Sequence, residues 1–241
     1  MTDIPILPRL TALGLHGMAQ SIEAQRASSI YAEMTFEDRL SHCLLVEEEL
    51  RGNRSRERLV RNARFKINAT PEGLDYGDSR GLQRGLIAEL CAGSWLNNGH
   101  NLIVTGPTGT GKTFVACALG LAAIRLGHSV RYFRVNLLLE QMAFAREDGS
   151  ISRMRAQIVK TDLLILDDLA IAPLEERGKE DLLELLDARV GEKSTIVAGQ
   201  RTFAEWHDYL DNPILADAIL DRMSQQAYKI QLKGESRRRP I

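Results

Sequence analysis

A glycine-rich stretch in the middle of the chain has the residue types and spacing that bind nucleotide phosphates. It reads Gly106-Pro107-Thr108-Gly109-Thr110-Gly111-Lys112-Thr113 and fits the pattern G-x-x-x-x-G-K-[ST]. Glycines allow a tight turn whose backbone amides point at phosphate oxygens, and the helix that follows adds the positive end of its dipole. Lys112 is expected to reach the β- and γ-phosphates, and the Thr113 hydroxyl to ligate Mg²⁺.

Two aspartates follow a short apolar run later in the chain. Residues 163–166 are Leu-Leu-Ile-Leu, and Asp167 and Asp168 come next. In P-loop NTPases the acid at the end of such a strand holds the magnesium ion, often through water, so Asp167 is the expected ligand. Asp168 could polarise the attacking water as a general base, although its side chain is shorter than the more usual glutamate. The pair favours nucleotide hydrolysis over binding alone.

Two further polar residues could complete such a site. Gln200 is the first large polar residue after the apolar stretch 194–198, where it could orient the attacking water; it could also be an exposed loop residue. Arg222 ends a predicted helix. It could stabilise the transition state at a neighbouring subunit's nucleotide, or it could simply interact with the dipole of its own helix. The residues alone leave both pairs of alternatives open.

Strands alternating with helices are predicted from residue 82 onward, and they would position these residues. The predicted strands are 101–105, 130–135, 162–166, 194–198 and 228–232, and the predicted helices are 86–96, 112–126, 137–146, 180–190 and 214–223. Five strands with intervening helices predict an α/β fold with a parallel sheet covered on both faces. The glycine-rich loop then connects the first strand to the next helix.

The part before residue 67 is predicted to be helical. A first helix ends near Arg26, and a second begins at Phe36 with Thr35 as its N-cap and a possible break at Gly52–Asn53. The stretch 68–81 is rich in Pro, Gly, Asp and Ser, which is typical of a linker. The expected organisation is a helical domain over 1–66, a linker over 67–81 and a nucleotide-binding domain over 82–241.

The composition of the 241 residues, 44% hydrophobic and 26% charged, is typical of a soluble globular protein. No apolar run approaches the roughly 18 residues of a membrane span, and the first residues do not resemble a secretory leader. Cys43, Cys91 and Cys117 lie far apart without a CxxC pair, which argues against a zinc site and favours a reducing cytoplasm.

The formal net charge of −1 conceals a strong segregation of charge. Residues 51–66 carry seven basic side chains against one acid, a net +6, whereas residues 161–192 carry a net −7. Such a basic helix favours contact with phosphate backbones, and the single aromatic residue, Phe65, favours duplex over single-stranded DNA. The alternative is a solvated face paired with Glu47–Glu49. The expected DNA contacts are Arg51, Arg54, Arg58, Arg61 and Arg64. The arginines at 237–239 are expected to form a disordered end with at most a minor DNA contact.

Five motifs together resemble one family. GPTGTGKT, LLILDDL, STIVAGQ, DNPILADAILDRM and KGES closely resemble the IstB-like branch of the AAA+ ATPases, helper proteins encoded beside the transposases of bacterial insertion sequences. The same branch includes the helicase loaders DnaC and DnaI. The resemblance covers nearly the whole chain. It implies an AAA+ core with sheet order 5-1-4-3-2, ATP and Mg²⁺ as cofactors, ATP-dependent self-assembly on duplex DNA, and delivery of that DNA to a partner transposase. It also implies that Gln200 is a sensor-1 residue and Arg222 an arginine finger.

The chain departs from the family pattern in two places. Gly199 stands where a small hydroxyl residue is expected beside the sensor, and no helical lid with a sensor-2 arginine follows the fifth strand. A replicative helicase loader shares every catalytic residue and differs only in its partner, so it remains the alternative function. A metabolic P-loop kinase is disfavoured, because no arginine-rich lid insert follows the core and the basic helix precedes the glycine-rich loop.

Overall fold

The computed structural model describes residues 5–77 and 80–236, so the predicted tail arginines at 237–239 lie outside the described residues. The chain divides into two compact units, Met1–Arg58 and Leu59–Ile241. Among the described residues, no helix combines the length and the apolar character that a membrane crossing requires.

The first unit is entirely helical, as expected. It contains α1 (Ile6–Ala12), α2 (His16–Ala27), the 3-10 turn η1 (Ser29–Tyr31) and the larger part of α3 (Phe36–Ala63). The prediction of one helix up to Arg26 is wrong, because Gly14 adopts a left-handed φ of 73° that separates α1 from α2. The predicted break at Gly52–Asn53 is also wrong, since α3 continues through it; one glycine costs a helix only about 1 kcal/mol.

A buried carboxylate fixes α2 to α3 within this unit. Glu47, on α3, is 5% exposed and accepts hydrogen bonds from the amides of Gly17 (2.6 Å) and Met18 (3.2 Å). These amides belong to the first turn of α2, where the helix itself offers no acceptor. A Cβ at Gly17 would lie 2.6 Å from Glu47 Cα, so the close approach of the two helices requires glycine there. Arg51 donates to the other oxygen of Glu47 (2.6 Å).

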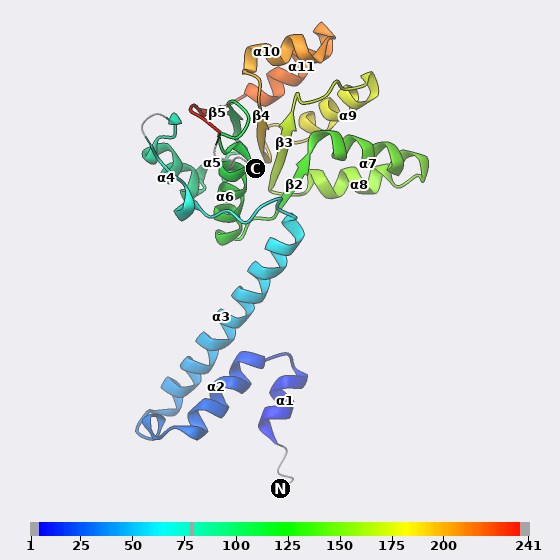
Figure 1. The fold of residues 1–241 in the computed structure, drawn as a ribbon. Helices are drawn as coiled ribbons and strands as arrows, with labels where there is room; N and C mark the ends of the chain where they lie inside the picture. Colours follow the sequence, from blue (N-terminus) through cyan, green and yellow to red (C-terminus); the bar gives the residue numbers. More distant parts are fainter. Residues whose placement is uncertain (1–4, 78–79, 237–241) are drawn as a thin grey trace. The chain divides into compact units, whose positions relative to one another are not determined.

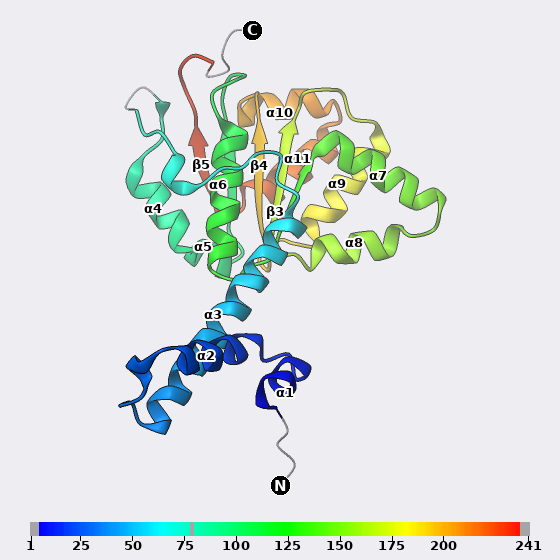
Figure 2. The same ribbon diagram turned by 60° about the horizontal axis from the view of Figure 1, so that its bottom comes forward.

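A five-stranded parallel sheet forms the centre of the second unit (Figures 1 and 2). Its strands are β1 (Asn101–Thr105), β2 (Val130–Arg134), β3 (Leu163–Leu169), β4 (Ser194–Gly199) and β5 (Ala227–Gln231). The order is β2-β3-β4-β1-β5 and all four pairings are parallel, which confirms the predicted 5-1-4-3-2 arrangement. After β5 the described chain runs to Ser236 without a further helix.

Helices cover both faces of this sheet. Alternate residues of each strand enter two hydrophobic clusters: Leu163 and Ile165 pack with α6, whereas Leu164 and Leu166 pack with α9 and α11. The helices on the first face are α4 (Arg84–Ala92), α5 (Ser94–Asn97) and α6 (Lys112–Arg125). Those on the second face are α7 (Val135–Glu147), α8 (Ile151–Val159), α9 (Glu176–Asp187), α10 (Phe203–Leu210) and α11 (Pro213–Ser224).

Several boundaries differ from the prediction. The predicted helix 86–96 is two helices, since Gly93 adopts a left-handed φ of 82° between α4 and α5. Helices α8 and α10 were not predicted. The third strand extends to Leu169, beyond the predicted end at residue 166.

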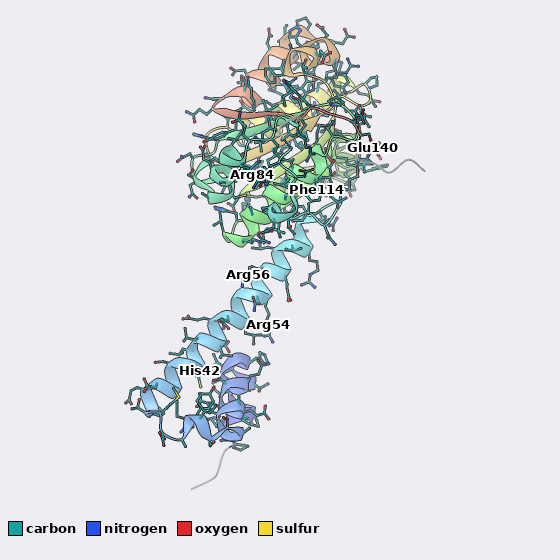
Figure 3. All side chains as sticks on the ribbon, turned by 60° about the vertical axis from the view of Figure 1, so that its left-hand side comes forward. His42, Arg54, Arg56, Arg84, Phe114 and Glu140 are labelled. Atoms are coloured by element: carbon teal, nitrogen blue, oxygen red, sulfur yellow. The ribbon has the colours of Figure 1, made fainter. Side chains whose placement is uncertain are left out.

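The segment between α3 and α4 lies along α6. Ala69 and Leu74 are buried in the same hydrophobic cluster as the residues of α6. Glu72, in the 3-10 turn η2 (Pro71–Gly73), forms an ion pair with Arg125 at the end of α6. A Cβ at Gly73 would lie 3.2 Å from the ring of Phe114, which is labelled in Figure 3. Part of the predicted linker therefore contributes to the core of the second unit.

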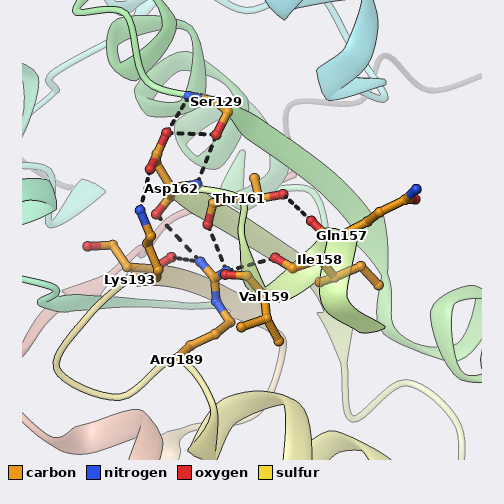
Figure 4. A network of polar contacts seen from close by, with 9 residues as sticks. Ser129, Gln157, Ile158, Val159, Thr161, Asp162, Arg189 and Lys193 are labelled. Carbon is orange, nitrogen blue, oxygen red and sulfur yellow. Dashed lines mark hydrogen bonds and ion pairs between the residues drawn. The ribbon is translucent and has the colours of Figure 1, made fainter. Parts of the chain in front are cut away.

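Buried hydrogen bonds join the chain at the amino-terminal edge of the sheet (Figure 4). Arg189 is 1% exposed and donates to the hydroxyl of Thr195 and to the carbonyls of Ile158, Val159, Thr161, Asp162 and Ser194. Burial lowers the pKa of Arg189 to about 10. One guanidinium thus connects the end of α8 to the starts of β3 and β4.

Asp162 extends the same network. It accepts hydrogen bonds from Lys193 Nζ (2.6 Å) and from the amide (2.9 Å) and hydroxyl (2.7 Å) of Ser129. Partial burial raises the pKa of Asp162, but the hydrogen bonds from Lys193 and Ser129 outweigh burial and bring that pKa to about 2. The carboxylate therefore ties the residues before β2, β3 and β4 together.

Candidate nucleotide site at the carboxyl edge of the sheet

The glycine-rich loop lies where it was predicted, between the end of β1 and the start of α6. Gly106, Gly109 and Gly111 have φ values of 148°, 84° and 100°, which side chains rarely adopt. The Lys112 side chain is buried beside the loop, and its Nζ donates to the carbonyls of Gly106 (2.7 Å) and Pro107 (2.9 Å). The loop therefore curves around the lysine ammonium group.

Two segments far apart in the sequence lie against this loop. Arg80 is buried and donates to the carbonyls of Thr110 (2.7 Å) and Asp75 (2.6 Å). The amide of Lys233, after β5, donates to the Arg80 carbonyl (2.9 Å). A Cβ at Gly109 would lie 2.6 Å from Ser236 Cβ, so the KGES residues after β5 reach the loop.

Neither contact was predicted from the sequence. For the KGES residues a signal existed, because the expected strand order sets the fifth strand beside the first. Residues that follow these two strands must then meet at the same edge of the sheet.

The structure brings together the two predicted metal ligands. Thr113 is in the first turn of α6, and its hydroxyl donates to Asp167 Oδ2 at 2.7 Å across 54 residues of sequence. Asp167 is 1% exposed at the end of β3. Hydroxyl and carboxylate oxygens are the hard ligands that Mg²⁺ prefers, so this pair fits the ion.

A tyrosine that was not predicted contacts the same carboxylate. Tyr132, on β2, donates its hydroxyl to Asp167 Oδ2 at 2.7 Å. Burial, together with this hydrogen bond to a carboxylate, raises the pKa of Tyr132 well above its usual value. The tyrosine is therefore a neutral donor.

Asp168 occupies a distorted position in β3. Its φ is 62°, and the pairing of β3 with β4 shifts register between Leu166 and Leu169. Its carboxylate accepts a hydrogen bond from Arg134 Nε (2.7 Å) and lies 3.5 Å from Lys66 Nζ. Arg134 ends β2 and pairs with Asp167 in the sheet register, so its position follows from the strand order. The predicted base is thus ion-paired with two cations that were not predicted.

Gln200 reaches the glycine-rich loop from the end of β4. Its side chain is exposed, and its Oε1 accepts a hydrogen bond from the Thr108 hydroxyl (2.7 Å). The preceding Gly199 leaves no room for the hydroxyl residue that the family pattern suggests. A Cβ there would lie 2.8 Å from the ring of Trp206 and 3.0 Å from the carbonyl of Leu169. The packing of the α10 tryptophan explains this departure.

Arg222 lies far from the loop of its own chain. Its carbonyl accepts a hydrogen bond from Asn101, the first residue of β1, whereas the loop follows the last residue of β1. A five-residue strand is about 16 Å long, so the two sites lie at opposite edges of the sheet. The guanidinium is ion-paired with Asp187 (3.0 Å) and Asp221 (3.3 Å).

The predicted DNA contacts lie on α3 or directly after it. Arg54, Arg58, Arg61 and Arg64 are exposed, and none of them is ion-paired within the part of the chain that the structure describes. Arg51 differs, since it is ion-paired with Glu47 at 2.6 Å. Figure 3 labels Arg54 on this helix, together with Arg56, which donates to Asn53. In the described part of the chain, pairing with the preceding glutamates therefore occupies Arg51 and leaves Arg54, Arg58, Arg61 and Arg64 without a carboxylate partner.

Comparison with known proteins agrees with this geometry. Residues 8–240 match the family model described as IstB-like ATP binding protein. The insertion-sequence ATP-binding protein y4pL of Sinorhizobium fredii is 40% identical over 235 residues, 98% of this chain and 96% of the relative. That of IS1162 from Pseudomonas fluorescens is 45% identical over 197 residues, 80% of this chain and 84% of the relative.

A solved structure of the DnaC helicase loader shares the fold. It superposes with a TM-score of 0.58 at 18% identity, over 69% of this chain and 97% of the loader. The family model spans nearly the whole sequence, and the sheet carries the phosphate-binding loop at the edge where ligands bind in such folds. The chain belongs to the IstB-like ATP binding proteins and is a P-loop ATPase with the AAA+ fold.

Proposed function

We propose that this ATPase binds Mg²⁺-ATP, assembles with further copies of itself on duplex DNA, and delivers that DNA to the transposase of an insertion sequence. The observation that carries the proposal is the row of exposed arginines Arg54, Arg58 and Arg61 on α3, which have no carboxylate partner among the described residues, in a chain with an ATP site. Its relatives are ATP-binding proteins of insertion sequences, which supports transposition as the context.

The phosphate chain of ATP would occupy the curve of the glycine-rich loop. Lys112 Nζ, now bonded to the Gly106 and Pro107 carbonyls, would turn to the β- and γ-phosphates. Thr113 and Asp167 would hold Mg²⁺, which supplies positive charge to the phosphate oxygens when bound. The hydrogen bond between Thr113 and Asp167 places these two oxygen ligands side by side.

Asp168 is proposed as the general base for the attacking water. To accept a proton, its carboxylate must be accessible to water. One carboxylate oxygen must therefore be released from the ion pairs with Arg134 and Lys66, or must accept a hydrogen bond from water beside them. Gln200, which already reaches Thr108 of the loop, would orient that water. In this proposal the Asp168 carboxylate accepts the proton and the neutral Gln200 amide positions the water.

Arg222 is proposed to act on the nucleotide of a neighbouring copy. Its location at the opposite edge of the sheet from the loop supports a role in trans over one in its own site. The cation would stabilise charge that develops on the phosphate. Its ion pairs with Asp187 and Asp221 would have to open for this role.

A helicase loader is the second candidate function. It is favoured by the similarity in fold to DnaC, which extends over almost all of that protein. The two functions differ in partner, so co-precipitation separates them. Retention of the transposase supports the first, and retention of a replicative helicase alone supports the second.

Fluorescence anisotropy with a labelled duplex tests the DNA contact. The triple variant Arg54→Ala, Arg58→Ala, Arg61→Ala is compared with wild type over a salt series, with AMPPNP or ADP present. Each lost phosphate contact lowers the slope of log affinity against log salt by about 0.9, so a decrease of about 2 to 3 is expected. ATP binding by the monomer should remain unchanged.

The matched control removes three exposed arginines outside the proposed surface: Arg9→Ala, Arg26→Ala and Arg153→Ala. It loses the same charge, so a similar decrease in slope would indicate a general charge effect. Unchanged DNA affinity of the α3 variant at moderate salt would exclude these arginines as the DNA contact.

A further inference from the structure

We infer that Tyr132 is a positioning residue for the magnesium ligand Asp167. The inference rests on the proposed Mg²⁺-ATP binding and assigns a role to a residue on the neighbouring strand. The Tyr132 hydroxyl and the Thr113 hydroxyl both donate to Asp167 Oδ2, each at 2.7 Å. The other oxygen, Oδ1, accepts the amide of Asp168 at 2.9 Å.

Counting the acceptor positions of the carboxylate shows what the tyrosine does. A carboxylate oxygen offers about two lone-pair sites, so two hydroxyl donors saturate Oδ2. Oδ1 has one donor among the described residues and therefore one remaining position. Tyr132 therefore leaves Asp167 a single open position, on Oδ1, from which it can reach the ion or one of its water ligands.

The same arrangement orients Thr113. Because the hydrogen of its hydroxyl points to Asp167, the lone pairs of that oxygen face away from the carboxylate and are available to a cation. With Tyr132 removed, Oδ2 would have one donor in place of two. The carboxylate could then rotate, and Thr113 would lose its fixed orientation with it.

Tyr132 can perform this role because its ring is fixed. The residue is 7% exposed and belongs to the hydrophobic cluster on the α6 face of the sheet. The sheet register pairs it with Ile165, two residues before Asp167 on β3, and side chains two residues apart share a face. The core therefore holds the hydroxyl at one place beside the carboxylate.

The variant Tyr132→Phe removes the hydroxyl and keeps the ring. Tyr228→Phe is the matched control, since Tyr228 is on β5 and donates to Glu89 (2.8 Å), away from the metal ligands. The probe is a fluorescent ATP analogue, titrated first in EDTA and then with increasing Mg²⁺. Partners that orient metal ligands typically contribute 10- to 100-fold to metal affinity.

For Tyr132→Phe we expect the Mg²⁺ concentration at half-saturation to rise about tenfold. Nucleotide affinity in EDTA should stay within twofold of wild type. Tyr228→Phe should match wild type in both measurements. An unchanged Mg²⁺ half-saturation in Tyr132→Phe would overturn the inference, whereas a wild type without any Mg²⁺ dependence would overturn the proposed function as well.

A double-mutant cycle separates positioning from a merely structural bond. In an Asp167→Asn background, Tyr132→Phe should change the Mg²⁺ dependence less than twofold, because the carboxylate it orients is gone. A structural role would instead lower the melting temperature and leave the Mg²⁺ dependence of the folded protein unchanged. An equal tenfold effect in both backgrounds would also contradict the inference.

Discussion

The two edges of the central sheet use buried and half-buried charge differently. At the amino-terminal edge, Arg189 and Asp162 are held by backbone carbonyls, a serine and a lysine of the same chain. At the carboxyl edge, Lys112 is also bonded to carbonyls, but these belong to the loop that would hold the phosphates. Asp167 meets hydroxyl groups there, one of which is also a potential metal ligand.

The difference separates charges that serve the fold from charges that serve the site. The Arg189 network connects the starts of two strands to the end of α8, so losing it would leave several buried carbonyls unsatisfied. The bonds from Lys112 Nζ to the Gly106 and Pro107 carbonyls join no two secondary-structure elements and can be exchanged for a ligand. Burial alone therefore does not distinguish a structural charge from one in the site. The hydrogen-bond partners of the charged group distinguish them.

The largest effect is expected at the amino-terminal edge. Arg189→Met would leave buried carbonyls without a donor and lower the free energy of unfolding by about 4 kcal/mol. Urea denaturation measures the loss. The exposed Arg153→Met is the control and should change stability by less than about 0.5 kcal/mol. If Arg189→Met proved as stable as wild type, the network would not be structural.

The next effect concerns the carboxyl edge. Lys112→Ala should weaken ATP binding at least 100-fold, which corresponds to about 2.7 kcal/mol, because the phosphates lose their cation. Its free energy of unfolding should change by less than about 1 kcal/mol. Isothermal titration and urea denaturation measure the two quantities.

Lys193→Ala, at the opposite edge, provides the reciprocal control. It should lose some stability through Asp162 and keep its ATP affinity. The comparison of the edges would fail if both lysine variants lost nucleotide binding or if both lost stability.

The smallest effect is a dependence of stability on pH. The pKa of Asp162 is about 2 in the folded chain and 3.8 ordinarily, so its contribution is complete above about pH 5 and is lost as the pH falls through 4 toward 2. Asp162→Asn should be about 1 kcal/mol less stable than wild type at pH 7, since partial exposure reduces the full value. Urea denaturation at pH 7, 4 and 3 should show this difference shrinking. A difference independent of pH would contradict the assignment.

The sheet was predictable from the sequence because β1, β3 and β4 are short apolar runs, and β2 and β5 alternate apolar and polar residues. The two unpredicted helices also carried signals. Ile151, Met154 and Ile158 have helical spacing in α8, and Thr202 with Glu205 forms the capping box of α10. Both helices are short, and a short amphipathic run is hard to distinguish from a loop.

The site was most predictable where its residues belong to short sequence motifs. The glycine-rich loop and the two aspartates are local motifs. The contacts of Tyr132 and Arg134 depend instead on the register of β2 against β3, and a shift of one residue would turn both side chains to the other face. Arg80 meets the loop through a segment without regular structure, whose path the sequence pattern does not determine.

The backbone at Asp168 limits which acids can serve at that position. A left-handed φ of 62° costs most side chains about 1 to 2 kcal/mol, whereas aspartate and asparagine adopt it more readily. Glutamate would gain the reach of one methylene group but would lose this conformational tolerance. Aspartate, the shorter acid, therefore suits the bend in β3. If Asp168 acts as the base, the bent backbone must bring its carboxylate as close to the water as a longer glutamate side chain would.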